Sequence, residues 1–420
     1  MQNLTILTNK RKIINDPVYG FINIPSDFIY DIIERPWFQR LRNIRQLGLT
    51  NFVYPGANHN RFQHSLGALH LMSMALDTLK TKGVCISEEE EEAAYLAILL
   101  HDIGHSPFSH ALEKTIIEGI NHEELSFFLI NKLNEFYSGK LNLAIDILFG
   151  NYQRMFLHEL ISSQMDMDRL DYLRRDSFFT GVIEGLVSSE RIIRMLNVVN
   201  DSLVVEEKGI YSLEKFLFAR RVMYWQVYMH KTVVSAESLL VRLLNRAREL
   251  VADGKDIFTT PALGFFLRNK IEKGDLLRDV SFATNLIAEH FTSLDDSDIL
   301  IAAKYWANHS DKVLSDLARR LIVRDLFAIE LSNDSFSKDR IAGLRKRVEK
   351  DKILEESESR FFVYSGAVSN LPYSPEFHEI KILLKNGNTD VISSVSDIFN
   401  HKFMSEKIVK YFLCFPKEYR

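Results

Sequence analysis

Cysteine and long apolar runs are scarce in this chain. Its 420 residues include two cysteines, Cys85 and Cys414, which lie too far apart to suggest a disulfide framework. No apolar run approaches the roughly 20 residues that cross a bilayer. The polar, basic residues 1–12 lack the apolar core of a signal peptide. We therefore expect a cytoplasmic protein in a reducing compartment, with no membrane partner.

Strong net charge is absent as well. The 52 Lys and Arg residues nearly balance the 56 Asp and Glu residues, and the formal net charge is −4. This balance gives no electrostatic case for a dedicated nucleic-acid binder, so nucleic acid is not an expected partner. Hydrophobic residues make up 46% and charged residues 26% of the chain, which is ordinary for a globular protein.

Helical patterns fill most of the first 325 residues. Ser87 followed by Glu90 is a capping box that starts a helix, whereas residues 12–24 are typical of an extended segment with a turn. A small β excursion is expected at 195–211. Helices are expected at 27–35, 37–47, 61–80, 88–100, 107–118, 122–136, 139–149, 154–165, 167–177 and, as one long helix, 213–252.

The pattern changes after about residue 325. β-like runs at 361–364, 379–384 and 408–414 alternate there with short helices. We expect a mainly α fold with a C-terminal α+β appendage. The expected division is a core of residues 1–325 and an appendage of residues 326–420.

The stretch from Leu96 to His110 carries the strongest chemical signal. Its apolar run, typical of a buried helix, ends in His101-Asp102, and Gly104 then allows a sharp turn. An imidazole and a carboxylate side by side at a helix end can point at one cation. Taken alone, such a pair is more often a capped helix end, so the interpretation depends on other segments.

Three other segments supply matching residues. Arg61 and His64 lie three apart, hence on one helical face, and Asp168, Tyr172 and Asp176 lie four apart on another. Each segment alone could be a hydrogen-bonded core residue or a solvated acidic face. Together they offer two histidines and two carboxylates for one metal site: His64, His101, Asp102 and Asp168. Such a mixed site suits Mn, Fe, Ni or Zn better than Ca.

A cation in this site would bind a phosphate oxygen and offset charge that develops at phosphorus. His105 could then act as general acid on the leaving oxygen, tuned by Glu113 or Glu123. Arg61 and Arg169 flank the expected ligands and could clamp phosphate oxygens.

Several segments together resemble the HD-domain phosphohydrolases, and more closely the deoxynucleoside triphosphate (dNTP) triphosphohydrolases. The match runs from about residue 12 to about 252, in the branch of the animal sterile-alpha-motif/HD enzyme and its bacterial homologues. It implies an HD-domain helical bundle. The segments are Asn15-Asp16-Pro17, Phe38-Gln39-Arg40-Leu41, Arg45-Gln46-Leu47-Gly48, Pro55-Gly56-Ala57, Arg61-Phe62-Gln63-His64-Ser65-Leu66-Gly67 and the run from His101 to His110.

The resemblance implies a role for each matching residue. This family cleaves a dNTP at the α-phosphorus to give deoxynucleoside and triphosphate, with a divalent metal and additional Mg carried by the nucleotide. The metal ligands would be those named above, and the catalytic residues would be His105, His110, His122 and Glu123. The substrate would contact Gln46, Leu47, Arg61, Arg169, Tyr172, Asp176, Arg220, Tyr228 and Lys231.

The sequence departs from the family pattern at two of these places. Arg169 stands where the animal enzyme has a lysine, which keeps the charge but changes its geometry. Tyr224 replaces a histidine toward the base end of the site, which leaves the base preference open.

The resemblance also implies an activating nucleotide bound between subunits, and therefore a homo-oligomer, a tetramer or a dimer. Glu34 replaces an aspartate of the family in this set. The residues at the matching positions are Lys12, Asn15, Glu34, Gln39 and Arg42.

Two other functions remain open from the residues. Another HD phosphohydrolase, acting on nucleoside monophosphates, cyclic dinucleotides or other phosphoesters, would share the metal ligands but would not need the sugar-sensing residues. A nucleotide-binding regulator without turnover is the non-enzymatic alternative.

Overall fold

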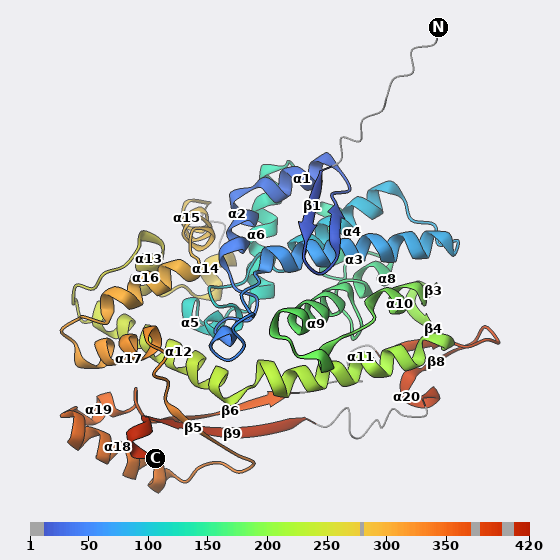
Figure 1. Ribbon diagram of the computed structural model, residues 1–420. Helices are drawn as coiled ribbons and strands as arrows, with labels where there is room; N and C mark the ends of the chain where they lie inside the picture. The colour runs from blue at the N-terminus through green and yellow to red at the C-terminus, as the bar shows by residue number, and fades with distance from the viewer. Residues whose placement is uncertain (1–11, 278–280, 371–378, 397–406) are drawn as a thin grey trace.

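The computed structural model describes residues 12–277, 281–370, 379–396 and 407–420. Helices dominate the described residues, and the small sheets add few strands, so the expectation of a mainly α fold with a C-terminal α+β part is confirmed (Figure 1). No helix among them combines the length and the apolar character that crossing a membrane requires.

Three helices form the centre of the fold. α3 (Arg61–Thr81) packs against both α4 (Glu88–Leu100) and α9 (Met167–Thr180). Each begins with a side chain that caps its first turn, and Ser87 with Glu90 makes the expected capping box on α4. Local signals therefore set where these helices start, and burial of their apolar residues holds them together.

The remaining helices surround this centre. Those before residue 200 are α1 (Asp27–Glu34), α2 (Pro36–Gln39), α5 (Glu113–Ile116), α6 (His122–Phe136), α7 (Asn142–Leu148), α8 (Met155–Glu159) and α10 (Ser189–Arg194). Those after it are α11 (Ile210–Met223), α12 (Lys231–Ala252), α13 (Pro261–Arg268), α14 (Lys273–Leu277), α15 (Ser281–Thr292), α16 (Asp296–Trp306), α17 (Lys312–Ile322), α18 (Lys338–Lys352), α19 (Glu356–Ser359) and α20 (Ile392–Val395).

The expected single helix over 213–252 is wrong. α11 ends at Met223, a π-helical turn follows over Tyr224–Tyr228, and His230 caps the start of α12 by accepting a hydrogen bond from the Thr232 N–H. The break is tied to a distant loop, because the Tyr54 hydroxyl donates to the Gln226 carbonyl over 2.6 Å. It turns the side chains around Tyr228 into the cavity described below.

Three other expected helices are shorter than predicted, of which the one over 154–165 is α8 and ends at Glu159. The helix over 37–47 stops at Gln39, and a 3-10 turn follows over Arg40–Asn43. Ile44 is extended because the backbone after it pairs with the segment before α3. In this pairing the Gln46 N–H donates to the His59 carbonyl over 3.0 Å. The helix over 107–118 is broken because Phe108 and Ser109 both have φ near +55°.

Three small sheets complete the fold. β1 (Ile13–Asp16) and β2 (Gly20–Asn23) form an antiparallel hairpin, in agreement with the extended segment expected there. A second sheet has the order β3-β4-β7-β8 and a third the order β5-β9-β6. Their strands are β3 (Leu196–Val199), β4 (Ser202–Glu206), β5 (Ala328–Ser332), β6 (Tyr364–Asn370), β7 (Lys381–Leu383), β8 (Thr389–Val391) and β9 (Ile408–Phe415).

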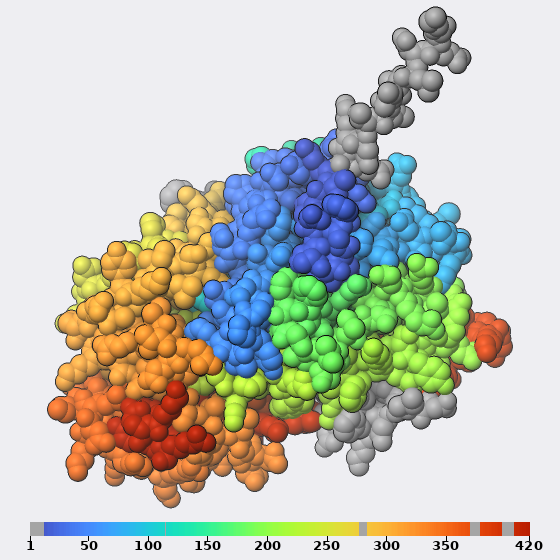
Figure 2. All heavy atoms as spheres, viewed as in Figure 1, coloured from blue at the N-terminus to red at the C-terminus, as the bar shows by residue number. Residues whose placement is uncertain are grey.

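The β1–β2 hairpin lies on the surface beside α9, where dark blue meets green in Figure 2. Arg175 of α9 donates to Asp16 of β1 over 2.7 Å, and both side chains are buried. The hairpin is thereby fixed to the helix that carries Asp168.

The segment after residue 325 contacts the rest of the chain at two places. The β5-β9-β6 sheet lies along α12 (Figure 1), and the Ser235 hydroxyl donates to the Phe327 carbonyl over 3.0 Å. Farther along the chain, β7 pairs in parallel with β4, where Ile382 lies opposite Val205. Residue 325 itself falls between α17 and β5.

Candidate active site

The four residues expected to bind one metal converge. α3 presents His64, the end of α4 presents His101 and Asp102, and the first turn of α9 presents Asp168. His64 Nε2 lies 3.0 Å from Asp168 Oδ1 and 3.5 Å from Asp102 Oδ2. His101 Nε2 lies 3.5 Å from Asp168 Oδ1 and 3.3 Å from Asp102 Oδ1.

Hydrogen bonds fix which nitrogen of each imidazole faces this centre. His64 Nδ1 donates to Asp171 Oδ2 over 2.7 Å, and His101 Nδ1 donates to the Ile98 carbonyl over 2.6 Å. Both Nε2 atoms are buried and make no well-formed hydrogen bond with the described residues. His64, His101 and Asp168 present ligand atoms close enough to hold one divalent transition metal, and Asp102 lies within 3.5 Å of both imidazoles, so the residues fit such a metal.

The carboxylates of the centre also favour positive charge between them. Burial disfavours a charged His64, but hydrogen bonds to Asp168 and Asp171 outweigh it and raise the pKa of His64 to about 10. The carboxylates thus attract positive charge, which a divalent cation would supply in place of a proton.

Asp171 was not among the expected site residues. It lies fully buried between His64 and Arg175, whose Nε and Nη2 atoms each donate to it over 3.0 Å. Gly67 of α3 makes room for this pair, because a Cβ there would lie 2.0 Å from Asp171 Oδ1. Its position three residues after Asp168, on the same helix, is the signal that could have identified it.

Arg61 makes its side-chain hydrogen bonds at the metal centre. Its Nη1 atom donates to Asp102 Oδ2, and its Nε atom donates to the Ser109 hydroxyl over 2.8 Å. Burial would raise the pKa of the Asp102 carboxyl, but Arg61 and the neighbouring histidines hold that pKa well below its usual range. Asp102 is therefore kept as a carboxylate.

A cluster of three histidines lies beside the metal centre. The His105 ring stacks on the His122 ring at 4.1 Å, and the His110 ring stands edge-on to both. Glu113 accepts hydrogen bonds from His122 Nδ1 over 2.8 Å and from His110 Nδ1 over 3.1 Å. Of the two glutamates considered for tuning, Glu113 makes these bonds.

His105 differs from its two neighbours in its environment. It is buried, its Nε2 atom lies 3.2 Å from Asp102 Oδ1, and its Nδ1 atom has no hydrogen-bond partner among the described residues. Burial and then the charge of Arg61 lower its pKa well below the ordinary value. His110, in contrast, is exposed.

A cavity of about 420 Å³ opens onto both clusters. It brings together most of the residues that the family resemblance assigned to catalysis and substrate binding. The expected residues that line it are Gln46, Leu47, Arg61, Asp102, His105, His110, His122, Glu123, Asp168, Arg169, Tyr172, Asp176 and Tyr228.

Asp176 lines the cavity and accepts hydrogen bonds from two other side chains. The Tyr228 hydroxyl donates to Asp176 Oδ2 over 2.8 Å, and His59 Nε2 donates to Asp176 Oδ1 over 2.7 Å. His59 was not predicted; it lies in an irregular loop, and no motif spacing connects it to Asp176.

Two expected substrate residues do not line this cavity. Arg220 is buried and donates to the Gln164 side chain over 3.4 Å, and Lys231 is exposed at the start of α12. Their substrate contacts remain predictions.

The residues expected to bind an activator lie away from this cavity, near α1, α2 and β1. Arg42 donates to the Gln39 side chain over 2.6 Å, and the Gln39 amide donates to the Ile33 carbonyl, one residue before Glu34. Lys12 Nζ lies 5.1 Å above the Tyr30 ring of α1, and Asn15 is exposed on β1.

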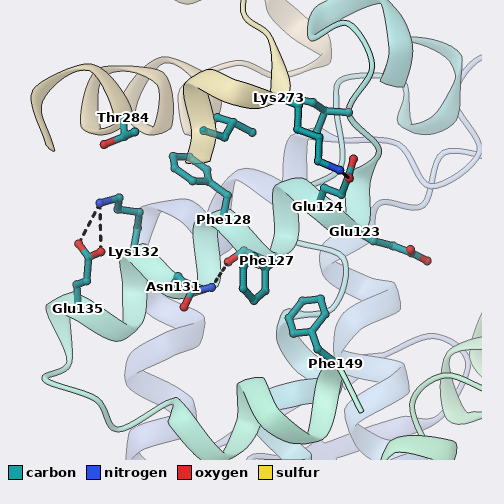
Figure 3. Close-up of a pocket in the computed structure, with 12 residues that line it drawn as sticks. Glu123, Glu124, Phe127, Phe128, Asn131, Lys132, Glu135, Phe149, Lys273 and Thr284 are labelled. Carbon is teal, nitrogen blue, oxygen red and sulfur yellow. Dashed lines mark hydrogen bonds and ion pairs between the residues drawn. The ribbon is translucent and has the colours of Figure 1, made fainter. Parts of the chain in front are cut away.

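A second cavity, of about 610 Å³, lies along α6 (Figure 3). Phe127, Phe128 and Phe149 form its apolar part, and Glu123 lines both cavities. In Figure 3 the Glu123 carboxylate points away from these rings. Its expected catalytic role remains a prediction.

A histidine on one helix, a His-Asp pair at the end of a second and an aspartate on a third define the site of an HD domain. The family model for the HD domain matches residues 61–176, and that for the HD associated region matches residues 187–259. The chain belongs to the HD-domain phosphohydrolases, in the branch that includes the SAMHD1 proteins and their bacterial homologues.

The relatives differ in how much of the chain they share. The uncharacterized protein YwfO of Bacillus subtilis is 31% identical over 98% of this chain and 93% of its own length. The deoxynucleoside triphosphate triphosphohydrolase SAMHD1 of Gallus gallus is 31% identical over 56% of this chain, and the Dictyostelium discoideum homologue is 32% identical over 57%. The chain spans 45% and 50% of their lengths, respectively. The crystal structure of a phosphohydrolase from Bacteroides thetaiotaomicron superposes with a TM-score of 0.92, at 50% identity over 97% of this chain and all of that one.

Proposed function

We propose that this chain is a metal-dependent hydrolase that cleaves dNTPs at the α-phosphorus, releasing deoxynucleoside and triphosphate. The observation that carries the proposal is the convergence of His64, His101, Asp102 and Asp168 at the wall of a cavity that also contains Gln46, Leu47 and Asp176. Relatives named as dNTP triphosphohydrolases support the choice of substrate.

In this proposal the four converging residues hold Mn, Fe, Ni or Zn, and additional Mg arrives with the nucleotide. When bound, the transition metal would supply positive charge that offsets charge developing on the phosphoryl oxygens. Arg61 keeps Asp102 ionised, and Asp171 and Ile98 keep the two imidazoles in the tautomer that ligates through Nε2.

The histidine cluster would carry the acid–base chemistry. His105 is the buried, neutral member, so its unpaired Nδ1 atom can accept a proton or a hydrogen bond. His110 and His122 both donate to Glu113 through Nδ1, which fixes the orientation of their rings. Burial and the charge of Arg61 disfavour a protonated His105, so we assign delivery of a proton to the leaving 5′ oxygen, expected of His105 from the sequence, to the exposed His110, with His122 and Glu123 beside it.

The far part of the cavity would hold the deoxynucleoside. Asp176 and Tyr228 would bind the 3′ hydroxyl, Tyr172 would stack near the sugar, and Gln46 with Leu47 would occupy the space of a ribose 2′ hydroxyl. Arg61, Arg169 and Arg220 would hold the phosphates, and Lys231 would also contact the substrate.

Product analysis tests the reaction. The metal-loaded protein is incubated with each of dATP, dCTP, dGTP and dTTP in ¹⁸O-labelled water, and the products are resolved by chromatography and mass spectrometry. We expect deoxynucleoside and one ¹⁸O atom in the triphosphate. Monophosphate and pyrophosphate would contradict the proposal, and so would retention of all four dNTPs with each of the four metals. An Asp168→Asn variant is the inactive control.

Leu47→Ala separates this function from another HD phosphohydrolase activity. Removing the side chain makes room for a 2′ hydroxyl, so we expect hydrolysis of ribonucleoside triphosphates to rise by about tenfold relative to the dNTPs. A chain that acts on monophosphates or other phosphoesters would not gain this activity.

Regulation by a nucleotide is a further part of the proposal. Lys12, Asn15, Glu34, Gln39 and Arg42 would bind the activator between subunits of a homo-oligomer. Light scattering with and without dNTP tests it: we expect a larger assembly with nucleotide, and no change of mass in Arg42→Ala.

A further inference from the structure

Glu237 is a carboxylate of the cavity that lies outside both the metal centre and the histidine cluster, and it has no hydrogen-bond partner among the described residues. It comes from α12 and lines the cavity together with Leu47 and Gly48. Asp176, in contrast, is hydrogen-bonded by two side chains, and Asp102 by Arg61. The exposed part of Glu237 faces the cavity rather than the surrounding protein.

The fold holds this carboxylate closely at one position. Gly48 has φ of +50°, and a Cβ on it would lie 3.3 Å from Glu237 Oε1 and 3.0 Å from the Phe108 carbonyl. The loop that follows Leu47 therefore packs directly against Glu237. Because this half-buried carboxyl group has no donor in the protein, its oxygens are free to accept hydrogen bonds from a ligand in the cavity.

The triphosphate cannot be that ligand group. The cationic side chains of the cavity, Arg61 and Arg169, lie at the metal centre and beside Asp168, and phosphate oxygens are expected next to these charges rather than at Glu237. What remains of a nucleotide is its sugar and its base. The sugar hydroxyl already has Asp176 and Tyr228 in the function proposed above.

We infer that Glu237 is a specificity-determining residue that recognises guanine, its two carboxylate oxygens accepting hydrogen bonds from N1–H and the 2-amino group. This inference rests on the proposed dNTP hydrolase function and names the base that the site prefers. Guanine presents two adjacent donors on this edge, which match a carboxylate in a bidentate arrangement. Adenine and cytosine place a ring acceptor next to their amino group, and thymine has one imino donor between two carbonyls, so each sets an acceptor against the carboxylate.

Burial supports the same assignment. It raises the pKa of Glu237 to about 8, since nothing in the protein stabilises the ionised form. Two donors from guanine would stabilise that form and would take the place of the missing protein partners. Gln46 lines the cavity beside Leu47, and its buried Oε1 atom has no hydrogen-bond partner among the described residues. This atom could accept a further hydrogen bond from a nucleotide in the cavity.

The test compares nucleotides that differ in these donors. kcat/KM is measured for dGTP, dITP, dATP and dTTP with the wild-type protein and with Glu237→Gln, which keeps the shape of the side chain. We expect the wild type to prefer dGTP over dITP, which lacks the 2-amino group, by about tenfold. In Glu237→Gln the value for dGTP falls by about tenfold or more, while the value for dTTP stays within about twofold.

Controls address folding and position. Glu249→Gln changes the same side chain on the same helix, where it pairs at the surface with Arg360, and should leave all four values unchanged. Thermal unfolding of each variant reports whether it is folded. Two results would overturn the inference while leaving the hydrolase function standing. One is an equal fall of kcat/KM for dGTP and dTTP in folded Glu237→Gln. The other is a fall of kcat/KM for dATP instead of dGTP in that variant.

A different result separates the two proposals. If the wild type hydrolyses no nucleotide, the hydrolase proposal fails, and dGTP and dTTP, now stable, are titrated calorimetrically. Binding of dGTP at least about tenfold tighter than dTTP in the wild type but not in Glu237→Gln would uphold guanine recognition. Equal binding of the two nucleotides by the wild type would overturn it.

Discussion

Asp171 governs the metal centre although it is not one of the four converging residues. Its carboxylate orients His64 and is itself held by Arg175, in a chain that ends at Asp16 of the β1–β2 hairpin. All of these side chains are buried. The direction in which one imidazole points is thus set by residues from three separate segments of the chain.

Asp171→Asn tests this orientation. The change keeps the size of the side chain but removes the charge that pairs with Arg175, so we expect metal affinity to fall by about tenfold to a hundredfold. Metal content after dialysis against a graded series of chelator, read by mass spectrometry, checks it. Asp146→Asn at an exposed site is the matched control. Undiminished metal content in folded Asp171→Asn would count against a role in orientation.

Glu237 gives a pH dependence of stability. Its pKa is raised to about 8 in the folded protein from an ordinary value near 4.5, so the folded state binds the proton more tightly than the unfolded state. The protonated side chain is well accommodated at pH 4.5 and below, and its contribution to stability is lost as the pH rises through 8.

We therefore expect Glu237→Gln, which cannot ionise, to be more stable than the wild type at pH 8.5 by about 1–3 kcal/mol. At pH 5 the difference should nearly vanish. Urea unfolding of both proteins at the two pH values measures it. A constant difference across this range would show that the carboxyl group titrates alike in the folded and unfolded chain.

At the scale of elements, the histidine cluster depends on how closely α6 approaches the turn after α4. A Cβ on Gly104 would lie 2.2 Å from the Ser126 nitrogen and 2.4 Å from the His122 carbonyl. Gly104 is not among the residues with positive φ. The glycine is needed for this close approach rather than for the sharp turn that the sequence suggested.

Gly104→Ala should therefore push α6 away and separate the stacked rings of His105 and His122. We expect a loss of about 1–3 kcal/mol in the free energy of unfolding and a fall in any hydrolytic activity. Gly343→Ala is the control: Gly343 lies within α18 with open space around it, and alanine there should stabilise the helix by up to about 1 kcal/mol. Equal effects of the two substitutions would contradict the role of close packing at Gly104.

The elements that the sequence could predict are those whose ends are set by neighbouring residues rather than by distant ones. α3, α4, α6 and α9 carry their start signals locally, as caps such as Asn60 with Gln63, and their positions were predicted closely. The breaks within 37–47 and 213–252 depend on partners far along the chain, such as His59 for Gln46 and Tyr54 for Gln226. No local pattern encodes those partners.

The residues of the candidate site also fall into two groups, those in recognisable motifs and those placed by tertiary packing. His64, His101, Asp102 and Asp168 stand out because each belongs to a recognisable motif, and the structure places them together. Asp171, His59 and Glu237 belong to no such motif. Their positions follow from tertiary packing: against His64, beside Asp176 and next to Gly48. The convergence of these four residues was therefore predictable from their motifs, whereas the residues that surround them were not.

At the scale of the whole molecule, the C-terminal segment extends a sheet begun by the HD associated region. β3 and β4 lie within residues 187–259, and β7 with β8 completes their sheet from residues 381–391. Ile382 of β7 is fully buried, opposite Val205 of β4. The β5-β9-β6 sheet meanwhile packs against α12, so the segment after residue 325 is joined to the core at two separate places.

Ile382→Ala tests whether these parts unfold as one unit. Removing a fully buried side chain leaves a cavity, and we expect a loss of about 2–4 kcal/mol in the free energy of unfolding. If the two-place attachment makes the chain cooperative, calorimetry shows one transition in the wild type and one transition, at lower temperature, in the variant. Ile183→Ala, at a side chain that is 79% exposed, should change stability by less than about 0.5 kcal/mol. Two transitions, of which Ile382→Ala lowers one alone, would mean that the C-terminal segment unfolds independently of the helices that carry the metal centre.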